Sequence, residues 1–192
     1  MSSLIASLRI VAATLLVCVA GYTAAILGVA QLLTPDTAQG SLIERADGTL
    51  AGSRLIAQEF KEPKYFWPRP SAAGWNASAA AGSNKSPTSP DLTARATELV
   101  ARYGATPERP LPPELAAASG AGLDPHVSER AALYQVERVA AARPGLARER
   151  IKALIAEHAF APGGFLTPGR IVNVLELNLA LDREPAAAPG PP

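Results

Sequence analysis

The sequence predicts an α+β fold that is predominantly helical, with a single N-terminal transmembrane helix followed by one compact extracytoplasmic domain with long ordered loops. Three observations predict it: an uncharged apolar run at 10–33, helical periodicity after residue 90, and a Pro/Gly/Ser/Asn-rich segment that carries many of the aromatic side chains. We therefore expect a cytoplasmic N-terminus at 1–9, the span at 10–33, a soluble domain at 34–183 and a disordered Pro/Ala-rich tail at 184–192.

The apolar run is long enough to cross a bilayer. Residues 10–33 lie between Arg9 and Asp36 and contain no charged side chain. Crossing roughly 30 Å of hydrocarbon takes about 20 apolar residues. Two alternatives remain open: a signal peptide cleaved after Gly28-Val-Ala30, although signal cores are typically shorter, and a lipoprotein modified at Cys18, although the residue before it is bulky for that role.

The charges around the span predict its orientation. Arg9 and the α-amino group precede it, and the positive-inside bias then places the N-terminus in the cytoplasm and the domain outside. The rest of the chain is balanced in formal charge, so no polybasic stretch is available to bind anionic lipid.

Composition excludes several classes of protein. The 192 residues carry 18 Lys and Arg against 17 Asp and Glu, so the basic excess typical of nucleic-acid-binding proteins is missing. One Cys and two His residues leave too little material for a disulfide framework, a Cys-x-x-Cys redox site or a Cys-rich zinc site. The Lys-Ser pair at Lys85 is preceded by Asn84, where a phosphate-binding loop needs a glycine.

The first part of the expected domain reads as irregular structure. Residues 52–60 fit either a strand or a short helix. Residues 63–90 are dense in Pro, Gly, Ser and Asn, yet hold four of the ten aromatic residues of the chain. Flexible linkers do not normally concentrate aromatics, so we expect an ordered loop packed by its own rings, with Arg69 stacked among them.

Helical patterns dominate the second part. A helix is expected from Pro90 to about Tyr103 with Asp91 as its candidate N-cap, and residues 104–114 are Pro-rich and expected to be extended.

The remaining patterns run to the end of the domain. Residues 128–143 are expected to form a helix that buries a face including Leu133, and 147–158 form a second amphipathic helix. Residues 171–182 are ambiguous, because their alternating leucines fit a strand whereas Asn173 fits the cap of a last helix.

Ser119, Asp124 and His126 lie close together in the sequence and compose a possible hydrolase triad. Ala117 and Ala121 replace the glycines of a Gly-x-Ser-x-Gly turn, and three residues so close in one loop rarely adopt triad geometry. The simpler expectation is that Asp124 and His126 bond nearby backbone. An anchored hydrolase and a free-standing anchored binding module remain the two alternative functions.

Without a clear catalytic constellation, the sequence favours binding, since Tyr, Trp and Arg are preferred anchors at interfaces. The candidate partner-binding residues are polar or aromatic and lie in the loops or in the 128–143 pattern. They are Tyr65, Phe66, Trp67, Arg69, Trp75, Asn76, Ser83, Asn84, Ser119, Asp124, His126, Gln135 and Arg138. No catalytic, cofactor-binding or metal-binding residue is predicted.

Several segments, in order, carry a family resemblance. They are Gly52-Ser-Arg-Leu-Ile-Ala-Gln58, Tyr65-Phe66 with Arg69-Pro-Ser-Ala72, Asn76 with Gly82-Ser-Asn84, Pro87-Thr88, Ala118-Ser-Gly-Ala-Gly-Leu-Asp-Pro-His126, Tyr134-Gln-Val136 with Arg138-Val139, and Val172-Asn-Val-Leu-Glu-Leu-Asn-Leu-Ala-Leu-Asp182. Together they resemble the C subunits of the Kdp potassium-transporting P-type ATPases, the KdpC family. Trp75 departs from the usual Tyr, and Lys85-Ser86 and Ser89 depart from the usual loop sequence.

The resemblance implies a non-catalytic subunit of an ATP-driven potassium import complex in the bacterial inner membrane. Its partners would be the lipid bilayer, a channel-like potassium-translocating subunit, a P-type ATP-hydrolysing subunit and a small single-span peptide. ATP and potassium would be handled by the complex. Two roles are associated with the family: a catalytic chaperone that raises ATP affinity, and a cap over the potassium entrance of the channel-like subunit. A domain outside the membrane cannot touch cytoplasmic ATP, so the predicted orientation favours assembly and ion entry.

Overall fold

A computed structural model describes residues 2–45, 47–166 and 168–185 and divides the chain into two compact units, one ending at Leu42 and one beginning at Ile43. The disordered tail predicted for 184–192 lies outside the described residues from 186 onward.

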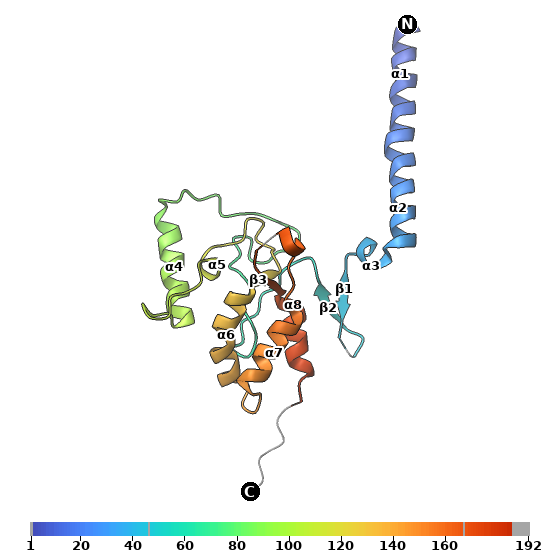
Figure 1. Cartoon of the computed structure of the whole chain (residues 1–192). Helices are drawn as coiled ribbons and strands as arrows, with labels where there is room; N and C mark the ends of the chain where they lie inside the picture. Colours follow the sequence, from blue (N-terminus) through green and yellow to red (C-terminus); the bar gives the residue numbers. More distant parts are fainter. Residues whose placement is uncertain (1, 46, 167, 186–192) are drawn as a thin grey trace. The chain divides into compact units, whose positions relative to one another are not determined.

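The first unit is a long apolar helix followed by a short turn of helix. It comprises α1 (Ser2–Leu15), a six-residue π-helix (Leu16–Gly21) and α2 (Tyr22–Leu33), and α3 (Pro35–Ala38) follows it (Figure 1). Among the described residues this is the one helix long and apolar enough to cross a membrane, and none of its side chains is buried against the chain itself. The helix begins before Arg9, because nothing in residues 2–9 stops it.

The second unit contains two small sheets and a set of helices. In one sheet β1 (Leu42–Glu44) pairs with β2 (Leu50–Ser53), and in the other β3 (His126–Ser128) pairs antiparallel with β4 (Ile171–Asn173). The helical elements are α4 (Pro90–Tyr103), α5 (Pro113–Ala116), α6 (Glu129–Ala142), α7 (Arg148–His158), a 3-10 turn (Gly164–Leu166) and α8 (Val174–Arg183). Helix α6 packs on α7, and α7 packs on α8 (Figure 1).

The core of this unit lies between the last three helices and the β3–β4 sheet. Helix α6 contributes Val136 and Val139, α7 contributes Ile151 and Ile155, and α8 contributes several of its leucines. Phe66 from the irregular segment and Leu115 from α5, both fully buried, add to it. The predominantly helical α+β prediction is therefore confirmed for the described chain.

Two of the expected helix boundaries are correct because their caps are local. Ser128 caps α6 by accepting from the backbone N–H of Ala131 at 3.1 Å, and Asn173 caps α8 by accepting from that of Glu176 at 3.2 Å. The strand alternative for the leucines of 174–182 is wrong. These residues form α8, and Leu177 and Leu181 are buried on the side of this helix that faces the core of the domain.

Two local expectations are wrong. Asp91 is not the N-cap of α4: Ser89 occupies that position, Pro90 takes the first helical one, and the carboxylate of Asp91 pairs with Lys85. Leu133 is 43% exposed, because the buried face of α6 is rotated onto Ala132, Gln135, Val136 and Val139.

Residues 52–60 form neither alternative throughout, since β2 ends at Ser53 and irregular structure follows. Residues 104–114 are largely extended as predicted, but Pro113 opens the short helix α5.

Candidate functional site

The aromatic loop, residues 63–75, is fixed by two buried amide side chains. Gln135 of α6 accepts from the backbone N–H of Trp67 at 2.8 Å and donates to the Trp67 carbonyl at 3.1 Å. Asn178 of α8 does the same for Phe66, at 2.8 and 3.0 Å. Each amide replaces one residue of a neighbouring strand, so this irregular backbone is buried without orphaned groups.

Two arginines hold the backbone just before these residues. Arg138 donates to the carbonyls of Pro63 and Tyr65 and to the side chain of Gln135, and Arg143 donates to the carbonyl of Lys64 at 2.9 Å. Four donor and acceptor side chains, two from α6, one from the residue that ends it and one from α8, thus determine the path of residues 63–67.

A second set of contacts joins the aromatic loop to the end of α8. Asp182 accepts from the hydroxyl of Tyr65 at 2.9 Å and pairs with Arg143 at 2.7 Å. Burial and the hydrogen bond to Asp182 raise the pKa of Tyr65, so its hydroxyl stays protonated as a donor at neutral pH.

The indole of Trp67 lies between two guanidinium groups. Arg138 lies 3.5 Å from the ring centroid and Arg102 of α4 lies 4.1 Å from it, while Tyr103 meets the ring edge at 5.2 Å. Burial lowers the pKa of Arg138 to about 10 and raises that of Tyr103 to about 12. Both groups therefore remain protonated at neutral pH, and Arg138 remains a cation.

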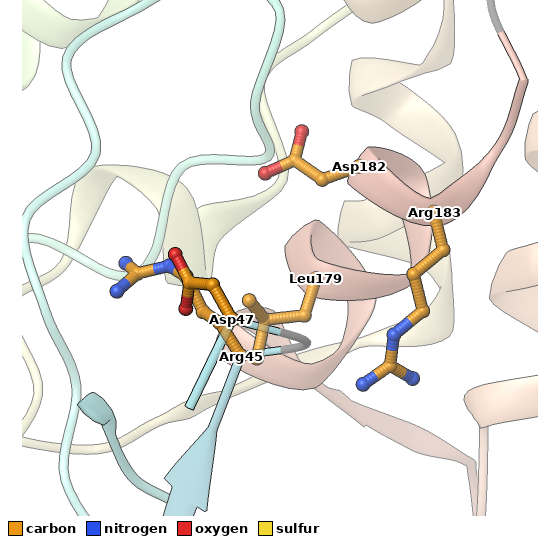
Figure 2. Close-up of a pocket in the computed structure, with 5 residues that line it drawn as sticks. All are labelled: Arg45, Asp47, Leu179, Asp182 and Arg183. Atoms are coloured by element: carbon orange, nitrogen blue, oxygen red, sulfur yellow. The ribbon is translucent and has the colours of Figure 1, made fainter. Parts of the chain in front are cut away.

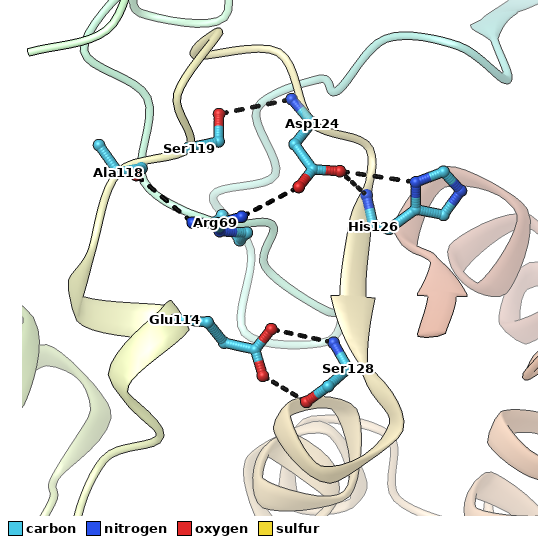
Figure 3. Close-up of polar contacts among 7 residues, drawn as sticks. All are labelled: Arg69, Glu114, Ala118, Ser119, Asp124, His126 and Ser128. Carbon is cyan, nitrogen blue, oxygen red and sulfur yellow. Dashed lines mark hydrogen bonds and ion pairs between the residues drawn. The ribbon is translucent and has the colours of Figure 1, made fainter. Parts of the chain in front are cut away.

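A second polar cluster connects the aromatic loop to the glycine loop, residues 118–124. Arg69 donates to Asp124 at 3.0 Å and to the carbonyl of Ala118 at 3.4 Å (Figure 3). Asp124 also accepts from the backbone N–H of His126 at 3.0 Å. Burial by itself raises the pKa of Asp124, but the bonds from His126 and the pairing with Arg69 outweigh it and hold the pKa below its usual value.

This cluster does not have the arrangement of a hydrolase triad. The hydroxyl of Ser119, 3% exposed, accepts from the backbone N–H of Asp124 at 3.5 Å, and Figure 3 places Asp124 between Ser119 and His126. In a triad the imidazole lies between the hydroxyl and the carboxylate. Here the imidazole of His126 lies on the other side of Asp124 from Ser119, with its Nδ1 3.5 Å from Oδ1 of that carboxylate, and its ring meets that of Phe160 edge to face at 5.7 Å. Nearby, Glu114 accepts from both the backbone N–H and the hydroxyl of Ser128 (Figure 3).

The candidates Trp75, Asn76, Ser83 and Asn84 lie apart from both clusters. Trp75 and Asn84 have left-handed backbone, with φ of 53° and 49°, and Asn76 accepts from the backbone N–H of Ser78. These residues shape the loop itself.

This later stretch approaches the glycine loop through backbone contacts. The N–H of Ala81 donates to the carbonyl of Ala121 at 2.9 Å. A Cβ on Gly122, whose φ is +71°, would lie 2.7 Å from the carbonyl oxygen of Ala81. Only glycine permits this approach.

A shallow groove of about 260 Å³ lies between the β1–β2 turn and α8. Arg45, Asp47, Leu179, Asp182 and Arg183 line it (Figure 2). Its charged side chains are of both signs, and Asp47 accepts from Thr49 within its own turn, which lowers the pKa of Asp47. The described part of the chain contains no group of three His, Cys, Asp or Glu residues suited to a metal ion.

The structure thus brings most of the sequence candidates together in two clusters that bind the chain's own backbone, whereas Trp75, Asn76, Ser83 and Asn84 lie outside both. It also adds Arg143, Asp182 and Arg102, which sequence reasoning missed, and Asn178, which was not among the candidate partner-binding residues. Asn178 stands in an alternating leucine run, where a polar residue on a buried helical face was the available signal.

Comparison with known proteins finds a single family. The family model described as "KdpC: K+-transporting ATPase, c chain" matches residues 4–183. The potassium-transporting ATPase KdpC subunit of Parvibaculum lavamentivorans is 68% identical over 183 residues, which cover 95% of this chain and 97% of the relative.

More distant relatives carry the same description. The KdpC subunit of Rhodopseudomonas palustris is 47% identical, with 88% of this chain and 89% of the relative covered. That of Xanthomonas campestris is 45% identical, with 88% and 82% covered. The chain therefore belongs to the KdpC family of potassium-transporting ATPase subunits.

Proposed function

We propose that this chain is a non-catalytic accessory subunit of an ATP-driven potassium import complex, needed for assembly of the complex and able to affect its activity. One observation carries the proposal: the family match spans both the apolar helix and the domain, and the conspicuous polar residues of that domain bind its own loops. Such a domain offers a preorganised surface to other proteins.

The partners that this proposal requires are the other subunits of the same complex. They are a channel-like subunit that moves potassium, a P-type subunit that hydrolyses ATP, and a small single-span peptide. The helix Ser2–Leu33 supports this set, because a membrane-spanning anchor restricts the domain to partners at the same bilayer.

Between the two family roles, we favour an action on assembly and ion entry over direct contact with ATP. Arg9 is the one charged residue before the apolar run, and the positive-inside rule then places the domain outside. Sidedness is measured by Ala94→Cys in a Cys18→Ala background, with a membrane-impermeant maleimide on intact cells. Residue 94 is exposed on α4. Labelling before lysis supports the outside role, and labelling only after lysis supports the chaperone role.

The main test is deletion of this subunit in its own host, followed by growth at micromolar potassium. We expect loss of high-affinity uptake and restoration by the wild-type chain. Unchanged uptake would refute the proposal. The hydrolase alternative predicts stand-alone activity that Ser119→Ala abolishes, whereas the accessory role predicts that Ser119→Ala has no effect on chemistry.

A further inference from the structure

The two guanidinium groups on either face of Trp67 lack an anion. Neither Arg102 nor Arg138 has a carboxylate within ion-pair distance among the described residues, although they face one indole from opposite sides. Arg143 and Arg150, in contrast, each pair with a carboxylate of the domain. Two cations this close are unfavourable unless an anion is near.

Trp67 is itself buried, and two partly exposed tyrosines continue the row of aromatic rings from it. The ring centroids of Tyr103 and Tyr134 lie 6.3 Å apart. The guanidinium of Arg109 lies over the Tyr134 ring, 4.3 Å from its centroid, and the Tyr134 hydroxyl donates to the Arg109 carbonyl at 3.1 Å. We call this surface the cationic-aromatic face. Its members are Trp67, Arg102, Tyr103, Arg109, Tyr134 and Arg138.

The members differ in how free their donors are. Arg138 is half-buried and donates to three acceptors of the domain. It therefore adds positive charge to this face, but its bonded N–H groups are not available to a partner. Arg102 is exposed and stacks on the indole, so its guanidinium N–H groups remain available on the surface. A guanidinium in this state suits bidentate binding of a carboxylate.

We propose that the cationic-aromatic face binds an acidic protein segment of a partner subunit, with an Asp or Glu carboxylate bound by Arg102. This inference rests on the proposed function. Arg, Tyr and Trp are the residues enriched at interface hot spots. Glu98 lies on the same helix as Arg102, and Glu108 is next to Arg109. Because these acidic side chains would repel a surface of many negative charges, the face suits a single carboxylate better than an anionic lipid surface.

A zero-length cross-link tests the contact directly in the whole complex. Arg102→Lys keeps the charge and adds a primary amine, which a carbodiimide joins to a neighbouring carboxylate as an amide with loss of water. We expect a new cross-link from position 102 to an Asp or Glu of a partner subunit. The matched control is Arg130→Lys, an exposed arginine on α6 outside this face, which should give none.

Charge reversal tests the energetics. Arg102→Glu should weaken association with the complex by about tenfold and Arg130→Glu should not. If the wild-type chain copurifies with its partners while neither the cross-link nor the weakening appears, this inference alone fails. If the wild-type chain does not copurify, the proposed function fails. If Arg102→Glu weakens binding to phosphatidylglycerol vesicles and leaves assembly unchanged, the ligand is lipid and the inference is overturned.

Discussion

Residues 63–70 and residues 76–89 belong to one irregular segment between β2 and α4, but the structure holds them by different means. The first stretch is bound through its main chain by side chains from α6 and α8, and Phe66 and Trp67 are buried. The second is mostly exposed and meets the rest of the domain through backbone contacts with the glycine loop. Low secondary structure therefore does not imply low stability, which depends on whether buried polar groups are satisfied.

The largest expected effect comes from a matched pair of asparagines. Asn178→Ala leaves the N–H and carbonyl of Phe66 buried and unpaired, and should lower the free energy of unfolding by about 3 kcal/mol. Asn76→Ala removes one exposed bond and should cost less than about 1 kcal/mol. Urea unfolding of the full chain in detergent, followed by tryptophan fluorescence, measures both. Equal losses would contradict the distinction between the two stretches.

A pair of glycines tests the backbone contact of the second stretch. Gly122→Ala puts a methyl group against the Ala81 carbonyl and should cost about 2 kcal/mol or more. Gly74→Ala, at φ +61° with open space around it, carries only the left-handed penalty of about 1 kcal/mol. The same urea titration compares them, and a Gly122→Ala variant as stable as Gly74→Ala would show that this contact yields freely.

The Arg69–Asp124 pair joins the first stretch to the glycine loop and makes stability depend on pH. The folded-state pKa of Asp124 lies below its ordinary value of 3.8, so ionisation favours the folded state. Its contribution is present above the unfolded pKa and is lost as pH falls through the folded one. Asp124→Asn should cost about 1.5 kcal/mol at pH 7. The difference in the free energy of unfolding between Asp124→Asn and wild type should become smaller below about pH 4. A difference that grows there would contradict the lowered pKa of Asp124.

The smallest effect is expected at the end of the second stretch. Lys85 and Asp91 pair with 47% and 66% of their side-chain surface exposed, and exposed pairs contribute little. Lys85→Ala should change the free energy of unfolding by less than about 0.5 kcal/mol. In 1 M salt, which screens the pair, the difference between variant and wild type should become smaller still. A loss above about 1 kcal/mol would mean that this stretch is held more firmly than its exposure indicates.

Local signals predicted much of the fold. Local patterns located α4, α6 and α7, and Ser128 marked the start of α6, whereas a helix capped by Asn173 was one of two alternatives left open for 171–182. The paired strands β3 and β4 were not identified, because each has three residues and its partner lies more than 40 positions away.

For the candidate site, the sequence predicted some of the residues but not the contacts that they make. Gln135 and Arg138 were candidates, but nothing local indicates that Gln135 bonds Trp67 across 68 residues or that Asn178 bonds Phe66 across 112. Such bonds are fixed by tertiary packing. The rotation of α6 that exposes Leu133 has the same origin, since periodicity does not distinguish neighbouring faces when alanines line one of them.

The long reach of the bonds from α8 has a consequence for synthesis of the chain. The hydrogen bonds between Phe66 and Asn178, between Tyr65 and Asp182, and between the Arg54 carbonyl and Asn173 each join residues more than 100 positions apart. None of them can form until the later residue has been synthesised. Contacts of such sequence separation form slowly, because loop closure precedes any gain. The anchor helix therefore emerges from the ribosome first, while the aromatic loop acquires its native path only after the last helix is complete.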